Sequence, residues 1–186
     1  SIFNALDTIR DIMQMGLKPP VIRLYNENES KQKFSKLGFK LKGCLLILCY
    51  EGNSNIINSE AMLSKDICVK YNGKYIGDQL GKLWFNNRFD TKHILEKEEE
   101  LGGISDAIEL AASWSRIKIL YKEIDNYFKE KKILLSSHFS HAYVDGISVY
   151  NIFFLNEQNE SKAIKAFYKV WNDVMKIALK NKSTIS

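Results

Sequence analysis

The second half of the chain restricts the fold most strongly, because strand and helix patterns follow one another there in an unbroken series. Alternating apolar residues predict strands, and apolar residues every three or four positions predict helices. In chain order the expected segments are a strand at Ile104–Ser113, a helix at residues 114–128, strands at residues 133–143 and 147–155, a helix at residues 163–178 and the start of a strand at residues 183–186. This βαββαβ order is that of a ferredoxin-like unit.

The first half predicts another α/β unit with a less regular pattern. Its first residues carry apolar side chains at helical spacing and therefore predict a helix. Gly16 can end this helix, and Pro19 and Pro20 prevent it from continuing. The segments expected next are a strand at Val21–Tyr25, a loop or short helix at residues 26–42, a strand at residues 43–50, a helix at residues 58–71 and a mixed region at residues 78–101.

Together the two halves predict an α+β protein. A chain of 186 residues is long enough to bury the core of one such domain. We expect ferredoxin-like halves at residues 1–103 and 104–186 that form an antiparallel sheet with helices on one face. Because the chain stops inside its last expected strand, which would leave an open sheet edge, we also expect it to be a fragment of a longer protein.

Charge and cysteine content narrow the classes of ligand and compartment. The formal net charge is +5, and the lysines are scattered among glutamates, which favours an anionic small molecule and gives no reason to expect nucleic acid. Cys44, Cys49 and Cys68 have no metal-ligand spacing and read as small core residues rather than as disulfide or metal-binding residues. We therefore predict no metal site and a reducing, cytoplasmic compartment. No apolar run is long enough to cross a bilayer.

The segment from His138 to Tyr150 carries the side chains best suited to acid–base chemistry. A two-residue turn at Asp145-Gly146 would pair His141 with Tyr150 on adjacent strands, with Cβ atoms about 5 Å apart, and would send His138 to the opposite face. An unperturbed tyrosine has a pKa of about 10, so it needs a neighbour such as histidine to act as an acid or base at neutral pH. The pair is therefore either a proton-transfer site or a polar patch, and the strand register decides between them.

Two arginines are candidate anchors for an anion. Arg23 lies on a short strand and is either solvated or a forked hydrogen-bond donor to a phosphate or carboxylate. Arg88 lies in an aromatic cluster with Trp84, Phe85 and Phe89, and it is either a second anchor or a stacked surface residue.

Four segments match short motifs in a fixed order. Residues 18–26 resemble P-x-x-[IV]-R-L-x-[DN], residues 84–90 resemble W-x-x-x-R-[FY]-D, residues 109–114 resemble E-T-A-x-x-W, and residues 138–150 resemble H-x-S-H-x-Y-x-D-G-x-x-x-Y. The motifs are those of FAD-linked oxidases of the vanillyl-alcohol-oxidase type, and among these of the alkyldihydroxyacetonephosphate synthases and their prokaryotic relatives. The resemblance spans nearly the whole chain.

The resemblance implies a cap domain that covers the flavin ring, while an FAD-binding domain absent from this chain holds most of the FAD. It implies that Tyr150 is the acid–base group. In the enzyme interpretation the histidine paired with it by the predicted hairpin, His141, tunes it, so both are expected to be catalytic. Arg23, His138 and Arg88 are the expected substrate-binding residues. The enzyme would exchange an acyl for an alkyl group on dihydroxyacetone phosphate, a step of ether-lipid synthesis, through a flavin adduct and without net redox change. The isolated fragment is expected to be inactive.

Other functions stay open. Relatives in the wider group oxidise 2-hydroxy acids such as lactate or glycolate, and Leu95 stands where the synthases carry an arginine. The family's H-H-H-G motif would begin just where the chain ends at Ser186. A non-catalytic ferredoxin-like module that binds a small ligand or a protein is the remaining alternative. A lipid-precursor substrate, a homodimer and peripheral membrane contact are compatible with the enzyme interpretation.

Overall fold

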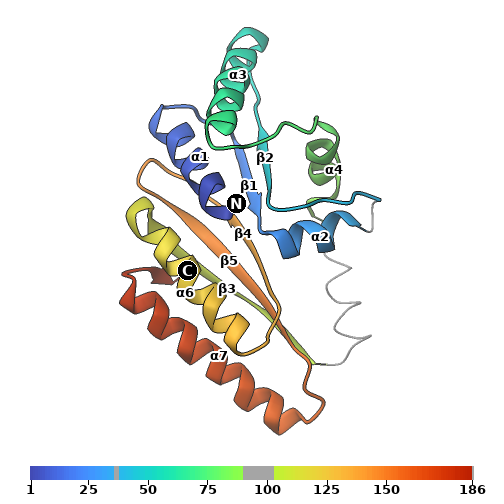
Figure 1. Ribbon diagram of the computed structural model, residues 1–186, viewed down its shortest axis with the longest axis vertical. Helices are drawn as coiled ribbons and strands as arrows, with labels where there is room; N and C mark the ends of the chain where they lie inside the picture. Colours follow the sequence, from blue (N-terminus) through green and yellow to red (C-terminus); the bar gives the residue numbers. More distant parts are fainter. Residues whose placement is uncertain (36–37, 90–102, 186) are drawn as a thin grey trace.

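The computed structural model describes residues 1–35, 38–89 and 103–185, and it confirms the α+β class (Figure 1). Six strands form one antiparallel sheet in the order β2-β1-β4-β5-β3-β6. The strands are β1 (Val21–Tyr25), β2 (Leu45–Cys49), β3 (Ile104–Ser113), β4 (Leu135–Ser140), β5 (Gly146–Leu155) and β6 (Thr184–Ile185). The described helices are α1 (Ile2–Gln14), α2 (Glu27–Ser35), α3 (Ser54–Lys70), α4 (Gln79–Asn87), α6 (Trp114–Glu130) and α7 (Glu160–Lys180). In this described part of the chain, no helix has the length and apolar content needed to span a membrane.

The second half has the ferredoxin-like topology that its element order predicts. β3, α6, β4, β5, α7 and β6 follow one another along the chain, and their strands lie in the order β4-β5-β3-β6 in the sheet. The first half extends the same sheet, because β1 pairs antiparallel with β4 through Leu24 and Phe139 and through Tyr25 and His138. The two halves are therefore joined edge to edge at the β1–β4 pair.

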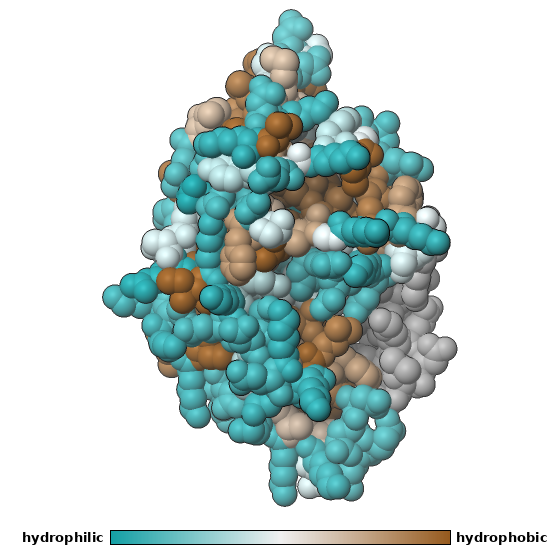
Figure 2. All heavy atoms as spheres, viewed as in Figure 1, coloured by the Kyte–Doolittle hydropathy of each residue, from teal (hydrophilic) through white to brown (hydrophobic). Residues whose placement is uncertain are grey.

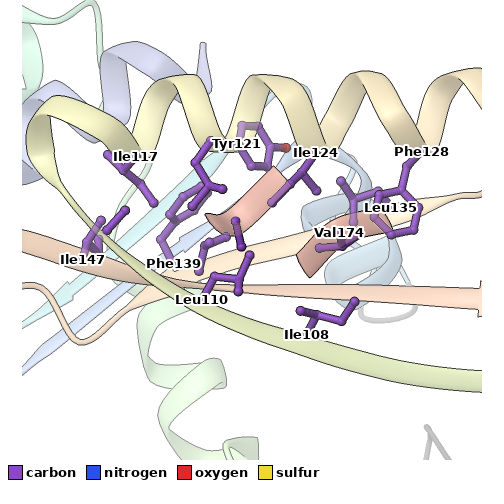
Figure 3. Close-up of a cluster of buried hydrophobic side chains, with 14 of the residues drawn as sticks. Ile108, Leu110, Ile117, Tyr121, Ile124, Phe128, Leu135, Phe139, Ile147 and Val174 are labelled. Carbon is purple, nitrogen blue, oxygen red and sulfur yellow. The ribbon is translucent and has the colours of Figure 1, made fainter. Parts of the chain in front are cut away.

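The main core lies between the sheet and α1, α6 and α7. β1, β3 and β5 contribute every second side chain to it along their buried parts, as the pleat of a strand requires. β5 shows this alternation along its whole length, with buried residues from Ile147 to Leu155 separated by partly exposed ones. Figure 3 shows the centre of the core, where side chains of α6 pack onto Leu110 and Phe139 of the sheet.

A smaller core lies on the opposite face of the sheet, where α2 and α4 cover β1 and β2. Its buried residues are Tyr25, Phe34, Leu45, Ile47, Leu80 and Trp84. On this same face the outward side chains of β5 are only partly covered by the described residues; these are Ser148, Tyr150, Ile152 and Phe154. This second face is therefore closed over β1 and β2 and more open along β5.

α3 contributes little to either core. It projects from the end of the sheet at the top of Figure 1, and its buried residues are Ser64 and Ile67. Its exposed large apolar side chains are Ile56, Met62, Leu63 and Val69. The face of the molecule shown in Figure 2 is mostly hydrophilic, and apolar groups are exposed at this projecting end.

Candidate functional site

Four side chains form a row across the more open face of the sheet. Tyr25 of β1 pairs with His138 of β4, His138 pairs with Tyr150 of β5, and Tyr150 pairs with Glu109 of β3. Directly paired residues point to the same face, and the neighbours of this row along the strands, Leu24, Phe139, Val149, Ile108 and Leu110, belong to the main core. We call these four residues the cross-strand row.

The observed register corrects the predicted hairpin. The partner of Tyr150 is His138 and not His141, so the pairing is shifted by three residues, and His138 lies on the same face as Tyr150 instead of the opposite one. β4 ends at Ser140, and residues 141–145 form the connection, with His141 in the left-handed region at φ 49°. Gly146 belongs to β5 and not to a two-residue turn: a Cβ at this position would lie 2.5 Å from the carbonyl oxygen of Ala112 on β3.

His138 is held between an aromatic ring and a carboxylate. Its imidazole stacks on the Tyr150 ring, with centroids 4.9 Å apart and planes 12° apart. Its Nδ1 lies 2.9 and 3.1 Å from the two carboxylate oxygens of Glu29 on α2. The ring of Tyr25, on the neighbouring strand β1, has its centroid 5.8 Å from that of the imidazole. These contacts fix both the tilt and the rotation of the imidazole.

The start of α2 is anchored to the sheet, which explains how Glu29 reaches His138. Asn26 Oδ1 accepts the backbone N–H of Glu29 at 2.9 Å, and Asn26 Nδ2 donates to the hydroxyl of Tyr121 at 3.2 Å. The backbone N–H of Asn26 also donates to Ser137 on β4 at 2.8 Å. The first turn of α2 therefore lies against β4, and the side chain of Glu29 is buried there.

The surroundings of Tyr150 keep its phenol protonated at neutral pH. Burial raises the pKa of Tyr150 to about 12, and the hydrogen bond and negative charge of Glu109 add to this shift. The positive charge of Arg23 acts in the opposite direction on the pKa of Tyr150. In this state the phenol is a proton donor, and added positive charge or loss of the Glu109 interaction would lower its pKa and increase the fraction of phenolate, the form that can accept a proton.

Replacing Glu109 with glutamine should lower the pKa of Tyr150 from about 12 toward 10, because a neutral amide removes the negative charge that disfavours phenolate. A raised folded-state pKa gives stability that is present below pH 10 and lost as the pH rises toward 12. The variant should therefore lose less stability over this range. NMR titration of ring-labelled tyrosine measures the pKa directly. Tyr121, whose pKa burial raises to about 12 inside the main core, is the internal control, and an unchanged Tyr150 titration would contradict the role of Glu109.

Arg23 faces the same region with its charge uncompensated. It lies on β1 with Val21 and Tyr25 on its face, and its guanidinium is 5.9 Å from the ring centroid of Trp84. Among the described residues no carboxylate forms an ion pair with it. A partly exposed guanidinium with an aromatic neighbour and no anionic partner can bind a phosphate or carboxylate.

Two other expected site residues lie outside the cross-strand row. His141 is exposed, with its ring 6.2 Å from that of Tyr150 and its Nδ1 hydrogen-bonded with Ser140 Oγ at 3.1 Å. Arg88 ends α4 on the surface, where its guanidinium stacks 3.9 Å from Phe85 and 4.4 Å from Phe89. The position of Leu95 lies outside the described residues.

Sequence reasoning missed Glu29 and gave Glu109 no role. The spacing Asn26-x-x-Glu29 is typical of a helix N-terminus, and it could have predicted α2 and the placement of Glu29 in its first turn. Glu109 stands between Ala107 and Ala111 on the outward face of β3, so it is the one charged side chain in that part of the strand. No local signal indicates that Glu109 pairs with Tyr150 or that Glu29 contacts His138.

Comparison with known proteins identifies the family. The family model described as FAD linked oxidases, C-terminal domain, matches residues 1–186. The FAD-linked oxidoreductase YgcU of Escherichia coli O157:H7 is 27% identical over 167 residues, which cover 84% of this chain and 34% of that protein. The alkyldihydroxyacetonephosphate synthase of Dictyostelium discoideum is 24% identical over 188 residues, covering 86% of this chain and 31% of that protein.

A solved structure of an alkyldihydroxyacetonephosphate synthase has the same fold, with a TM-score of 0.77 at 22% identity over 98% of this chain and 38% of that one. The chain spans about a third of the length of the curated relatives it matches. Its strand order, its helices and the family match over its whole length agree with one another. The chain belongs to the family of FAD-linked oxidase C-terminal domains.

Proposed function

We propose that this chain is the substrate-covering domain of an FAD-dependent enzyme of the alkyldihydroxyacetonephosphate synthase type, and that Tyr150 is its proton-transfer group. One observation carries the proposal: a phenol, an imidazole and a guanidinium without an ion-pair partner among the described residues share one partly open face of the sheet. The two relatives named as synthase or FAD-linked oxidoreductase support the class of enzyme.

The residues on this face fit a flavin ring. The stacked rings of His138 and Tyr150 give an aromatic surface at its centre, and hydroxyl, imidazole and guanidinium groups are available at its edges. Protein side chains cannot carry out two-electron transfer to carbon by themselves, and FAD supplies that chemistry when it is bound. In this proposal another part of the protein holds most of the FAD, and this chain covers the reacting side.

Each side chain has a separate task in the proposed site. Arg23 binds the substrate anion by forked hydrogen bonds, which suits the phosphate of a dihydroxyacetone phosphate ester. Tyr150 exchanges a proton with the substrate carbon or oxygen that lies over its ring edge. The pKa of Tyr150 is raised to about 12, and the positive charge of Arg23 opposes this shift. A substrate anion bound at Arg23 must therefore not cancel that charge completely, because the phenol needs it to release its proton.

Oxidation of a 2-hydroxy acid is the second candidate. Arg23 would bind a carboxylate as well as a phosphate, since both present two oxygens to the guanidinium fork. The phenol and imidazole would then lie beside the hydroxyl-bearing carbon. This candidate uses the same residues and differs in the fate of the electrons, which would leave the enzyme.

Turnover by the complete protein, with its FAD-binding part, separates the candidates. It should be incubated with an acyl-dihydroxyacetone phosphate and a long-chain alcohol, and separately with lactate or glycolate and an electron-accepting dye. We expect an ether product without dye reduction. Dye reduction by a 2-hydroxy acid would favour the second candidate. A complete protein that purifies without FAD would overturn both and leave a non-catalytic module.

A further inference from the structure

Glu29 is a buried carboxylate that the proposed site does not yet use. Its side chain is 12% exposed and that of its partner His138 is 17% exposed. Taking a carboxylate out of water is costly unless hydrogen bonds replace its solvation. The Nδ1 of His138, 2.9 and 3.1 Å from the two carboxylate oxygens, supplies a hydrogen bond of this kind, and the position of Glu29 in the first turn of α2 favours its negative charge.

The contact decides where the imidazole carries its proton. A carboxylate has no proton to donate, so Nδ1 must be the donor and Glu29 the acceptor. The neutral ring has only one N–H, and its other nitrogen, Nε2, then carries a lone pair. Nε2 has no hydrogen-bond partner among the residues the structure describes, and the ring is locked flat against Tyr150.

We propose that His138 is a general base for a substrate hydroxyl group and that Glu29 is its positioning residue, which holds the ring in the tautomer with a free Nε2. This inference rests on the proposed function and names the substrate class: a hydroxyl compound, whether a long-chain alcohol or a 2-hydroxy acid. His138 lies directly beside Tyr150 in the cross-strand row. Two proton-transfer groups therefore meet at one point of the sheet, one for a hydroxyl and one for the neighbouring reacting centre.

The proton balance of the step is simple. The O–H bond of the substrate breaks, its proton forms a bond with Nε2, and the electron pair stays on the oxygen. In an alcohol this oxygen becomes the nucleophile, and in a 2-hydroxy acid it becomes the carbonyl oxygen of the oxidised product. The imidazolium that forms keeps Nδ1–H on Glu29, so its positive charge is balanced where water is largely excluded. Release of the proton from Nε2 to water restores the base.

The tautomer of His138 can be read by NMR of the 186-residue chain labelled with ¹⁵N in its histidine rings, of which the sequence has three. At mildly alkaline pH we expect the proton of His138 on Nδ1. Glu29→Leu should move it to Nε2, and Glu29→Gln, which can donate as well as accept, should give both forms. If Glu29→Leu does not fold, Glu29→Gln decides alone. A proton on Nε2 in the unmodified chain, or the same tautomer in every variant, would refute the inference.

Glu27→Gln is the matched control. Glu27 lies in the same turn of α2, is exposed and pairs with Lys31 at 2.7 Å, away from the row. It should leave the His138 tautomer unchanged.

In the complete flavoprotein, Glu29→Gln should lower kcat about 10- to 100-fold with KM nearly unchanged, since the loss falls on proton transfer and not on binding. Glu27→Gln should have no such effect. An unchanged kcat together with a shifted tautomer would show that His138 is not a base. The NMR result does not depend on turnover. Failure of the proposed function is therefore recognised separately, by a Tyr150→Phe variant that keeps the full rate.

Discussion

Replacing Tyr150 with phenylalanine should lower kcat of the complete flavoprotein by at least about 100-fold while leaving its FAD content and thermal stability nearly unchanged. The substitution keeps the ring that stacks on His138 at 4.9 Å and removes only the hydroxyl. General acid–base groups contribute about 10²- to 10⁴-fold to a rate, so a loss in this range is expected in kcat. Loss of the hydrogen bond to the partly exposed Glu109 should cost no more than about 1 kcal/mol of stability.

Steady-state kinetics with the substrate that proves active, together with the flavin absorbance spectrum, would measure this effect. Tyr168→Phe is a suitable control, because Tyr168 is an exposed residue of α7, a helix that packs on the other face of the sheet. It should be indistinguishable from the unmodified protein. If Tyr150→Phe retained the full rate, Tyr150 would have no part in proton transfer.

Arg23→Ala should raise KM for an anionic substrate about 100-fold, because the loss of a charge-assisted bidentate contact costs several kcal/mol. Arg23→Lys should recover part of the affinity, since an ammonium group keeps the charge without the fork. Little structural cost is expected, because no described carboxylate loses a partner when the guanidinium is removed.

The decisive comparison uses an anionic substrate and a neutral analogue of it. Arg23→Ala should discriminate against the anion and affect the neutral compound much less. Arg116→Ala is the matched control, since Arg116 is an exposed arginine on α6 at the opposite face of the sheet. Equal losses with both compounds would indicate that Arg23 supports the fold around Trp84 and does not bind substrate.

Sequence patterns predicted the elements well where burial alternates regularly. The bounds of β1 and β3 agree with the prediction, because every second residue of each strand enters a core. The ferredoxin-like order followed from the same periodicity. For α2 the sequence leaves a loop and a short helix both open, since it is almost wholly polar and its one large apolar residue, Phe34, is buried against other segments of the chain.

The register of the β4–β5 hairpin could not be predicted from the chain alone. Asp-Gly is a strong turn signal, and it suggested a short connection that pairs His141 with Tyr150. The glycine has a long-range use instead: Gly146 pairs with Ser113 of β3, where the Ala112 carbonyl oxygen lies too close to leave room for a side chain. Gly146 follows its partner Ser113 on β3 by more than 30 positions. A local sequence pattern cannot reveal a contact between residues so far apart in the chain.

The β1–β4 pair has a consequence for how such a domain can diversify. Arg23 and Glu29 come from the first half of the chain, whereas His138, Tyr150 and Glu109 come from the second. A genetic crossover between relatives in the connection that joins the halves would separate the proposed anion anchor from the proposed proton-transfer groups, and neither half would keep the counterpart it pairs with. The two halves should therefore be inherited as one unit, and a chimaera divided there should recover activity only when one of the two paired strands, β1 or β4, is exchanged as well so that both come from the same parent.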